Sequence, residues 1–209
     1  MIKAENIYVY NIARAIYSAR NPMNSWDRSD SDLVHDVVGS NDLALARKLY
    51  QAGTEHRKYL RQIFVSMDVT APLLIWKQID QYKVGTVTNS TSTMHKLTAK
   101  PITIEDFSFD GYELYGEWKD PVSDVVIACE DLRKTYLKTK DKFYWELLIR
   151  LLPESYNQKR TLTMNYENVV AIIKQRTGHK LKEWADFIEV LKSLPYIKEI
   201  TEQSKVNKE

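Results

Sequence analysis

The chain has 209 residues and is poor in the residues that build several common kinds of site. Its single cysteine, Cys129, excludes an internal disulfide, and its six glycines form neither a GxGxxG nor a GxxxxGK phosphate-binding loop. The four histidines form no HExxH motif and lie far from the cysteine in sequence, so we expect no metal site. No GxSxG motif is present to support hydrolase chemistry. Cys129 lies in a helical pattern, which predicts a small core residue and not a nucleophile.

Neither sign of charge dominates, and long apolar runs are absent. The chain carries 30 basic and 28 acidic side chains, for a formal net charge of +2. This balance gives no support for non-specific nucleic-acid binding or for a role at a membrane surface. No apolar segment approaches the roughly 20 residues that a membrane span needs, and the N-terminus lacks the form of a signal peptide. We therefore expect a cytoplasmic protein with no membrane or nucleic-acid partner.

The hydrophobic spacing predicts an α+β domain over residues 1–200 with a polar tail at 201–209. Strands are expected at 7–10, 63–69 and 160–164, and helices at 41–51, 72–79, 121–152, 165–178 and 182–194. Asn41 or Asp42 can cap the first of these helices, and Asn165 can cap the fourth. The charge-rich stretch 134–142 is either a solvated part of one long helix or a break between two helices.

The segment Tyr82–Lys96 is the first candidate site. Six serines and threonines lie within residues 86–93. Such a run suits a helix interior poorly, because hydroxyls compete for backbone hydrogen bonds, so we expect a loop. Hydroxyls and backbone N–H groups, with Lys83, His95 and Lys96 beside them, can bind a phosphate. A solvated Ser/Thr turn explains the same composition.

The second candidate is the run from Arg176 to His179 at the expected end of a helix. A cation at this position is stabilised by the helix dipole, which is a purely structural explanation. The functional alternative is that Arg176 and His179 project into a pocket and bind a carbonyl or a phosphate.

Three segments, in order, resemble flavin-dependent thymidylate synthases, which use FAD to methylate dUMP. Leu60–Pro72 resembles the strand in which an F-R/E-H triplet leads to A-P, and Trp76–Lys83 stands where the family has a helix ending in R-H-R. Leu151–Pro153, Asn165 and Gln175–Glu183 resemble the family's V-L-P, W-x-x-N and L-R-x-x-x-H-x-x-x-E run. These segments cover about half of the chain. The resemblance implies a mostly antiparallel sheet flanked by long helices.

The signature motif of the family is altered. Gln81–Lys83 replaces R-H-R, Gln62 replaces the histidine of F-R/E-H, and Asn89–His95 keeps only the asparagine and the serine of N-E-x-S-x-R-Y. Lys83 can bind an anion only as a point charge, whereas an arginine fork binds it bidentately. Each charged hydrogen bond lost is worth roughly 1.5–3 kcal/mol. Because the replacements stay polar, a repurposed nucleotide pocket is favoured over an abandoned one.

Carried over residue by residue, the resemblance implies that Arg176 orients the pyrimidine and polarises its carbonyl. Asn89, Ser90 and Ser92 would bind the nucleotide phosphate. The residues implied to contact the flavin are Arg61, Gln62, Gln81, Tyr82, Lys83, Asn165 and His179. The implied cofactor is FAD, with NADPH and methylenetetrahydrofolate as cosubstrates and a homotetramer as the assembly.

Three functions remain open at this point. The first is a transferase that makes a methyl or hydroxymethyl deoxyuridine nucleotide from dUMP. The second is a catalytically inactive nucleotide-binding protein on the same fold, and the third is a structural homologue that acts through an interface. The compact size and the divergent motif suit a phage-encoded enzyme.

Overall fold

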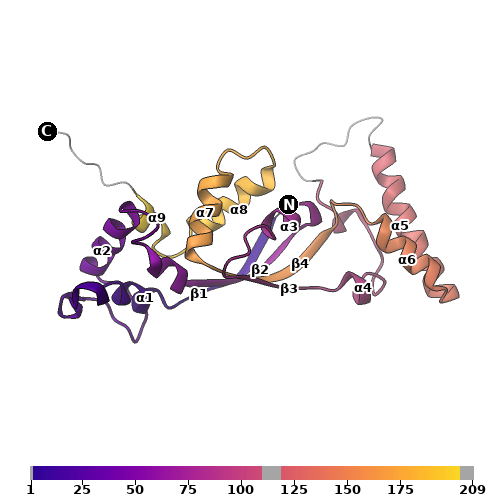
Figure 1. Cartoon of the computed structure of the whole chain (residues 1–209). Coiled ribbons are helices and arrows are strands. Elements are labelled where there is room, and N and C mark those ends of the chain that lie inside the picture. The colour runs from indigo at the N-terminus through magenta and orange to yellow at the C-terminus, as the bar shows by residue number, and fades with distance from the viewer. Residues whose placement is uncertain (1, 110–118, 203–209) are drawn as a thin grey trace. The chain divides into compact units, whose positions relative to one another are not determined.

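The chain forms two compact units in the computed structural model, which describes residues 2–109 and 119–202 (Figure 1). The first unit consists of Met1–Lys3, Val69–Tyr82 and Thr88–Thr161. The second unit consists of Ala4–Asp68, Lys83–Val87 and Leu162–Glu209.

A four-stranded antiparallel sheet has the strand order β1-β2-β4-β3. Its strands are β1 (Lys3–Tyr10), β2 (Phe64–Pro72), β3 (Thr86–Ser90) and β4 (Asn157–Asn165). Buried side chains alternate along the two central strands, as Val65 and Met67 do on β2 and as Leu162 and Met164 do on β4. This period of two is typical of strands that bury one face. The sheet and the helices together confirm the α+β class.

Strand β3 corrects the expectation of a loop after Lys83. The segment contains β3 and then the short helix α4 (Thr93–Lys96). Threonine and valine are β-branched and favour extended backbone, so the composition that disfavours a helix interior does not disfavour a strand. Just past β3, the backbone N–H of Thr91 donates to the carbonyl of Lys159 on β4 over 2.9 Å. This pairing with a partner far along the chain decides the conformation.

The first unit holds helices α3 (Leu73–Ile79), α5 (Lys119–Thr139) and α6 (Lys142–Leu151) and the 3-10 helix η4 (Ile104–Asp106). Helices α5 and α6 lie side by side (Figure 1). The break between them confirms that residues 134–142 contain a break between two helices and are not part of one long helix. Lys140 adopts a left-handed φ of 58°, and the carboxylate of Asp141 caps α6 by accepting from the backbone N–H of Phe143 over 2.9 Å.

A hydrophobic cluster in the first unit includes the cysteine. Its buried members are Leu97, Ile102, Phe107, Val126, Cys129 and Leu148. Burial raises the pKa of the Cys129 thiol, which keeps it protonated and unreactive. The interpretation of Cys129 as a small core residue is confirmed.

The second unit holds helices α1 (Ile12–Ser18), α2 (Ser40–Gln51), α7 (Tyr166–Arg176), α8 (Lys182–Lys192) and α9 (Ile197–Thr201), with 3-10 helices η1 (Asn21–Met23), η2 (Trp26–Arg28) and η3 (Lys58–Gln62). Helix α9 was not predicted. It is separated from α8 at Tyr196, whose φ of 61° is left-handed. Thr201 of the expected tail ends α9, and residues 203–209 lie outside the described residues. Within the described ranges, no helix combines the length and apolar character needed to cross a membrane.

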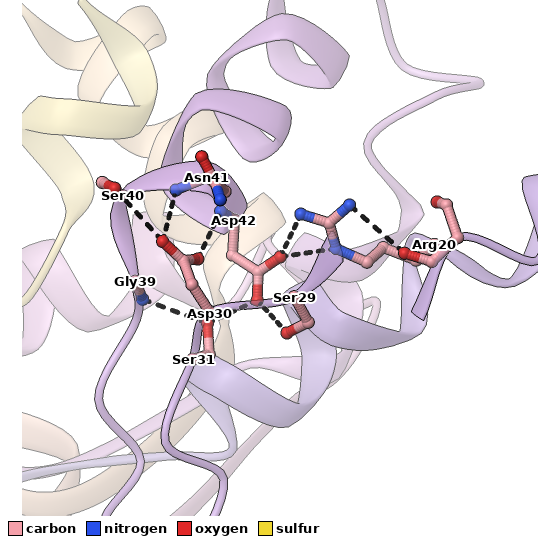
Figure 2. Close-up of polar contacts among 9 residues, drawn as sticks. Arg20, Ser29, Asp30, Ser31, Gly39, Ser40, Asn41 and Asp42 are labelled. Atoms are coloured by element: carbon pink, nitrogen blue, oxygen red, sulfur yellow. Dashed lines mark hydrogen bonds and ion pairs between the residues drawn. The ribbon is translucent and has the colours of Figure 1, made fainter. Parts of the chain in front are cut away.

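The start of α2 is capped from a distant loop and not by Asn41 or Asp42, as the sequence suggested. Figure 2 shows the carboxylate of Asp30 accepting from the backbone N–H groups of Asn41 (2.8 Å) and Asp42 (3.1 Å). Gly39 precedes the helix, and a β-carbon there would overlap the carboxyl group of Asp30. A glycine is therefore needed where the loop approaches the helix most closely.

Asp42 instead points into a buried polar cluster (Figure 2). Its carboxylate accepts from the Arg20 guanidinium (2.6 Å) and from the hydroxyls of Ser29 (2.6 Å) and Ser31 (2.5 Å). Asp42 is fully buried and Arg20 is only 6% exposed. Because each charge meets a partner inside the protein, the cluster fixes residues 20–31 against the first turn of α2.

Candidate functional site

The turn after α7 brings Arg176 and His179 together. Gly178 has a left-handed φ of 78°, and a β-carbon there would meet nothing within 4 Å, so glycine serves the backbone conformation alone. The N–H of His179 donates to the carbonyl of Arg176 over 3.0 Å, which closes the turn. The predicted helix end is confirmed.

A single indole lies beneath both side chains. The guanidinium carbon of Arg176 lies over the Trp184 ring, 4.7 Å from its centre. The His179 ring meets the same indole at 6.1 Å between centres and 60° between planes. Trp184 belongs to α8 and is fully buried, whereas Arg176 and His179 are half-buried. The two polar groups therefore share one fixed support.

The hydrogen bond of the His179 ring determines which nitrogen carries the proton. Nδ1 accepts from the backbone N–H of Leu181 over 3.1 Å. In the neutral imidazole the hydrogen must then be on Nε2, which becomes a donor. The turn thus combines a guanidinium with a ring N–H, a pair suited to binding carbonyl or phosphate oxygens.

The stretch Lys83–Val87 lies against the opposite end of α7. The carbonyl of Val84 accepts from the side-chain nitrogens of Asn165 (3.4 Å) and Asn168 (2.6 Å). Asn168 Nδ2 also lies 2.7 Å from the hydroxyl of Thr86. These amides hold the backbone of the stretch in place.

Asn165 is engaged on both sides of its amide. Its oxygen accepts from the backbone N–H of Asn168 over 3.0 Å, which confirms the predicted cap of α7. Its nitrogen donates to Val84, and the residue is 5% exposed. A cofactor could reach this amide, which the resemblance assigned to the flavin, only by displacing these bonds.

Helix α7 separates the two candidate clusters of the second unit. Its 11 residues rise about 15 Å at about 1.5 Å each. Lys83–Val87 contacts its first turn and Arg176 is its last residue. One chain therefore does not bring this stretch to Arg176.

The predicted phosphate ligands divide into two groups. Asn89 and Ser90 end β3, are exposed, and make no side-chain hydrogen bond within the described part of the chain. Ser92 is half-buried and caps α4, because its hydroxyl accepts from the backbone N–H of His95 over 3.2 Å. Asn89 and Ser90 are thus available to a ligand, whereas Ser92 already has a structural role.

Two cations among the predicted flavin ligands are also available. Arg61 lies in the last turn of η3 and Lys83 follows α3, and both are exposed. Neither side chain forms an ion pair or hydrogen bond with any described residue. They can therefore bind an external anion without first breaking an internal contact.

The remaining predicted flavin ligands make internal contacts. The side-chain oxygen of Gln62 accepts from the hydroxyl of Ser18 over 3.2 Å. The side-chain nitrogen of Gln81 donates to the carbonyl of Lys77, one turn back in α3, over 3.2 Å. Tyr82 is half-buried in the turn that ends the helix, where its N–H donates to Ile79.

Asn168 and Trp184 were missed by reasoning from sequence. Asn168 resembles any polar residue in a first helical turn. Its position three residues after the cap Asn165 could have indicated a side chain that bonds beyond its own helix turn. Trp184 is one of several large apolar residues at helical spacing on α8, a pattern typical of ordinary core. Among the described residues, no three His, Cys, Asp or Glu side chains are arranged to hold a metal ion.

Comparisons with protein-family models and with curated proteins give no match. The structure is similar to that of the flavin-dependent thymidylate synthase ThyX from Helicobacter pylori, complexed with FAD and dUMP. That likeness has a TM-score of 0.71 and 16% identity, and it covers 94% of this chain and 96% of the other. A UMP/dUMP methylase, PolB from Streptomyces cacaoi bound with 5-Br dUMP, matches with a TM-score of 0.61 and 14% identity over 92% and 88%. The predicted fold, an antiparallel sheet with helices as in ThyX, is confirmed.

Proposed function

We propose that the chain is a ThyX-like transferase that converts dUMP to a 5-substituted deoxyuridine nucleotide. The observation that carries the proposal is the likeness, over nearly the whole chain, to a thymidylate synthase complexed with FAD and dUMP. The second similar structure, a UMP/dUMP methylase, acts on the same kind of nucleotide. FAD is the proposed cofactor, and NADPH and methylenetetrahydrofolate are the proposed cosubstrates.

In this proposal the turn after α7 recognises the pyrimidine. Arg176 donates to a carbonyl of the ring and draws electron density towards that oxygen, which makes the ring more electrophilic. His179 supplies a second donor through Nε2. Asn89 and Ser90 are exposed donors for the nucleotide phosphate, and Ser92 orders the backbone beside them by capping α4.

The charges of the exposed residues suit the binding of FAD. Its pyrophosphate is an anion, and the exposed cations of Arg61 and Lys83 make no competing internal contact within the described residues. When bound, FAD would supply the hydride and the folate would supply the carbon unit. The chain's own part is to orient the nucleotide, hold the anionic groups and exclude water.

A complete site in this proposal draws on more than one copy of the chain. Lys83–Val87 and Arg176 lie at opposite ends of α7, about 15 Å apart along its axis. In the proposed homotetramer, one copy supplies the Arg176 turn and another supplies the cations.

The proposal is tested on the purified full-length chain. It predicts a yellow protein with flavin absorbance, or one that becomes so on addition of FAD, and NADPH oxidation that requires dUMP and methylenetetrahydrofolate. Light scattering during size exclusion measures the assembly, for which four copies are expected. Protein that takes up no flavin and oxidises no NADPH would contradict the enzymatic proposal.

The second candidate is a nucleotide-binding protein without catalysis. The engaged amides of Gln62, Gln81 and Asn165 favour it, because three of the residues assigned to the flavin already bond within the chain. Colourless protein whose melting temperature rises with dUMP would support this function. Protein that takes up no flavin and whose melting temperature does not respond to dUMP would support the third function, a structural homologue that acts through an interface.

A further inference from the structure

Trp184 carries no assigned role, yet it lies directly under the one arginine that the proposed function places on the pyrimidine. The Arg176 guanidinium is 4.7 Å from the centre of the indole ring. We infer that Trp184 is a positioning residue, which holds this guanidinium in the orientation that binds dUMP. The inference rests on the proposed function and deepens it.

The indole is well suited to fix a neighbour because it is itself fixed. Trp184 is fully buried on α8, and its ring packs against that of Phe187 with centres 6.2 Å apart. The His179 ring also meets it in a T-shaped arrangement, with centres 6.1 Å apart. Large buried side chains have few alternative rotamers, so the ring presents one constant face to Arg176.

Arg176 needs such support because of where it lies. It is the last residue of α7, next to a glycine turn, and its side chain is only half-buried. A long arginine side chain loses considerable rotamer freedom when it binds a ligand. Stacking on Trp184 restricts the side chain before the ligand arrives, so less freedom remains to be lost on binding.

The stacked geometry also leaves the guanidinium able to bind. A cation–π contact uses the flat face of the guanidinium, whereas its N–H groups lie in the plane and point away from its edge. A guanidinium has five such donors, so an edge of the group that faces a ligand can reach the carbonyl oxygens of a planar base in the same plane. The surface next to Trp184 therefore suits a carbonyl-bearing pyrimidine approached edge-on.

The test is isothermal titration of the full chain with dUMP, comparing wild type with Trp184→Leu and Trp184→Phe. Removing the cation–π contact is expected to weaken dUMP binding about three- to thirtyfold in Trp184→Leu. Trp184→Phe keeps an aromatic face and should recover most of the affinity. Leu191→Ala is the control, since it removes buried apolar volume from the same helix about two turns beyond Trp184, and it should bind dUMP like wild type.

A double-mutant cycle with Arg176→Gln, which keeps N–H donors but removes the cation, separates positioning from general damage to the fold. If Trp184 acts through the guanidinium, the effect of Trp184→Leu shrinks in the Arg176→Gln background. Additive effects, or equal losses in Trp184→Leu and Leu191→Ala, would overturn the inference. Should Trp184→Leu fail to fold, the cycle uses Trp184→Met, which fills more of the buried space without an aromatic face, and zero coupling there overturns the inference equally.

The two proposals fail in different ways. Wild-type protein that binds dUMP, together with a Trp184→Leu variant of unchanged affinity, overturns the role of Trp184 alone. Wild-type protein that does not bind dUMP overturns the proposed function and the inference that rests on it.

Discussion

A β-carbon on Gly85 would overlap the side-chain nitrogen of Asn165. The two residues meet where Lys83–Val87 contacts the first turn of α7, and Asn165 and Asn168 both donate to the carbonyl of Val84 there. Gly85 also has a left-handed φ of 71°. The close approach and the backbone conformation both require glycine, so this contact fixes the segment that carries Lys83.

Gly85→Ala tests that contact, with Gly178→Ala as its matched control. Both glycines have left-handed φ angles, but a β-carbon at Gly178 would meet nothing within 4 Å. Gly178→Ala should therefore lower the free energy of unfolding by the conformational penalty alone, about 1–2 kcal/mol. Gly85→Ala adds overpacking against Asn165, worth about a further 1–3 kcal/mol. Urea unfolding measures both, and equal losses would show that Asn165 moves aside freely.

Substitutions of Asn165 separate its capping role from a role in cofactor binding. Asn165→Ala should lower stability by about 1–2 kcal/mol, because the N–H of Asn168 loses its acceptor. Asn165→Asp keeps the acceptor at the helix N-terminus but puts a carboxylate oxygen where the amide nitrogen donates to Val84, so only part of the stability should return. Thermal melting measures this series. Wild-type stability with reduced flavin content in Asn165→Ala would instead assign the amide to the cofactor.

The buried pair of Arg20 and Asp42 should respond strongly when broken. Asp42→Ala leaves the guanidinium buried without its partner and removes the acceptor for the hydroxyls of Ser29 and Ser31. We expect a loss of about 3–5 kcal/mol in the free energy of unfolding. Replacing both charges, with Arg20→Met and Asp42→Leu, should lose much less. A double variant less stable than Asp42→Ala would contradict this account.

Glu130 gives a prediction for pH. The guanidinium of Arg133 binds its carboxylate through two bonds of 2.7 and 2.8 Å and lowers its pKa from 4.5 to about 2, helped by the N–H of Ile102. The folded-state pKa is depressed, so the stabilisation is complete above pH 4.5 and is lost as pH falls towards 2. At neutral pH it amounts to about 2 kcal/mol once screening of the partly exposed pair by water is allowed for.

The pH prediction is checked by urea unfolding of wild type and Glu130→Gln at pH 7 and pH 3. Glu130→Gln should be less stable than wild type at pH 7, and the difference should shrink at pH 3. Glu146→Gln is the control, because Glu146 pairs with Arg150 at the surface and should change stability little at either pH. A difference that persists unchanged at pH 3 would show that the charge of Glu130 is not responsible.

The elements that could be predicted are those whose signals are local. Asn165 lies beside the helix it caps, and Gly178 lies beside the helix end it permits, so a short window of sequence contains both partners. The break between α5 and α6 could be recognised because Lys134–Lys142 is rich in charge. Amphipathic spacing located α8 within two residues of its end.

The features that could not be predicted depend on partners far apart in the chain. Strand β3 forms because it pairs with β4, which lies about 70 residues later. The Ser/Thr composition of residues 86–93 does not reveal that partner. The cap of α2 comes from Asp30, and the partner of Asp42 is Arg20, 22 residues away. The candidate site also depends on a contact that the local sequence does not show. Helical spacing on α8 predicts that Trp184 is a core residue, but it does not predict that the Arg176 guanidinium lies over the indole ring.

The most direct test of the central claim is a spectroscopic titration of FAD-saturated protein with dUMP. The account predicts a saturable change in the visible flavin spectrum for wild type and a much weaker response for Arg176→Ala, with the apo melting temperature of the variant little changed. A wild-type protein that binds no FAD, or whose flavin spectrum is indifferent to dUMP, would contradict the account.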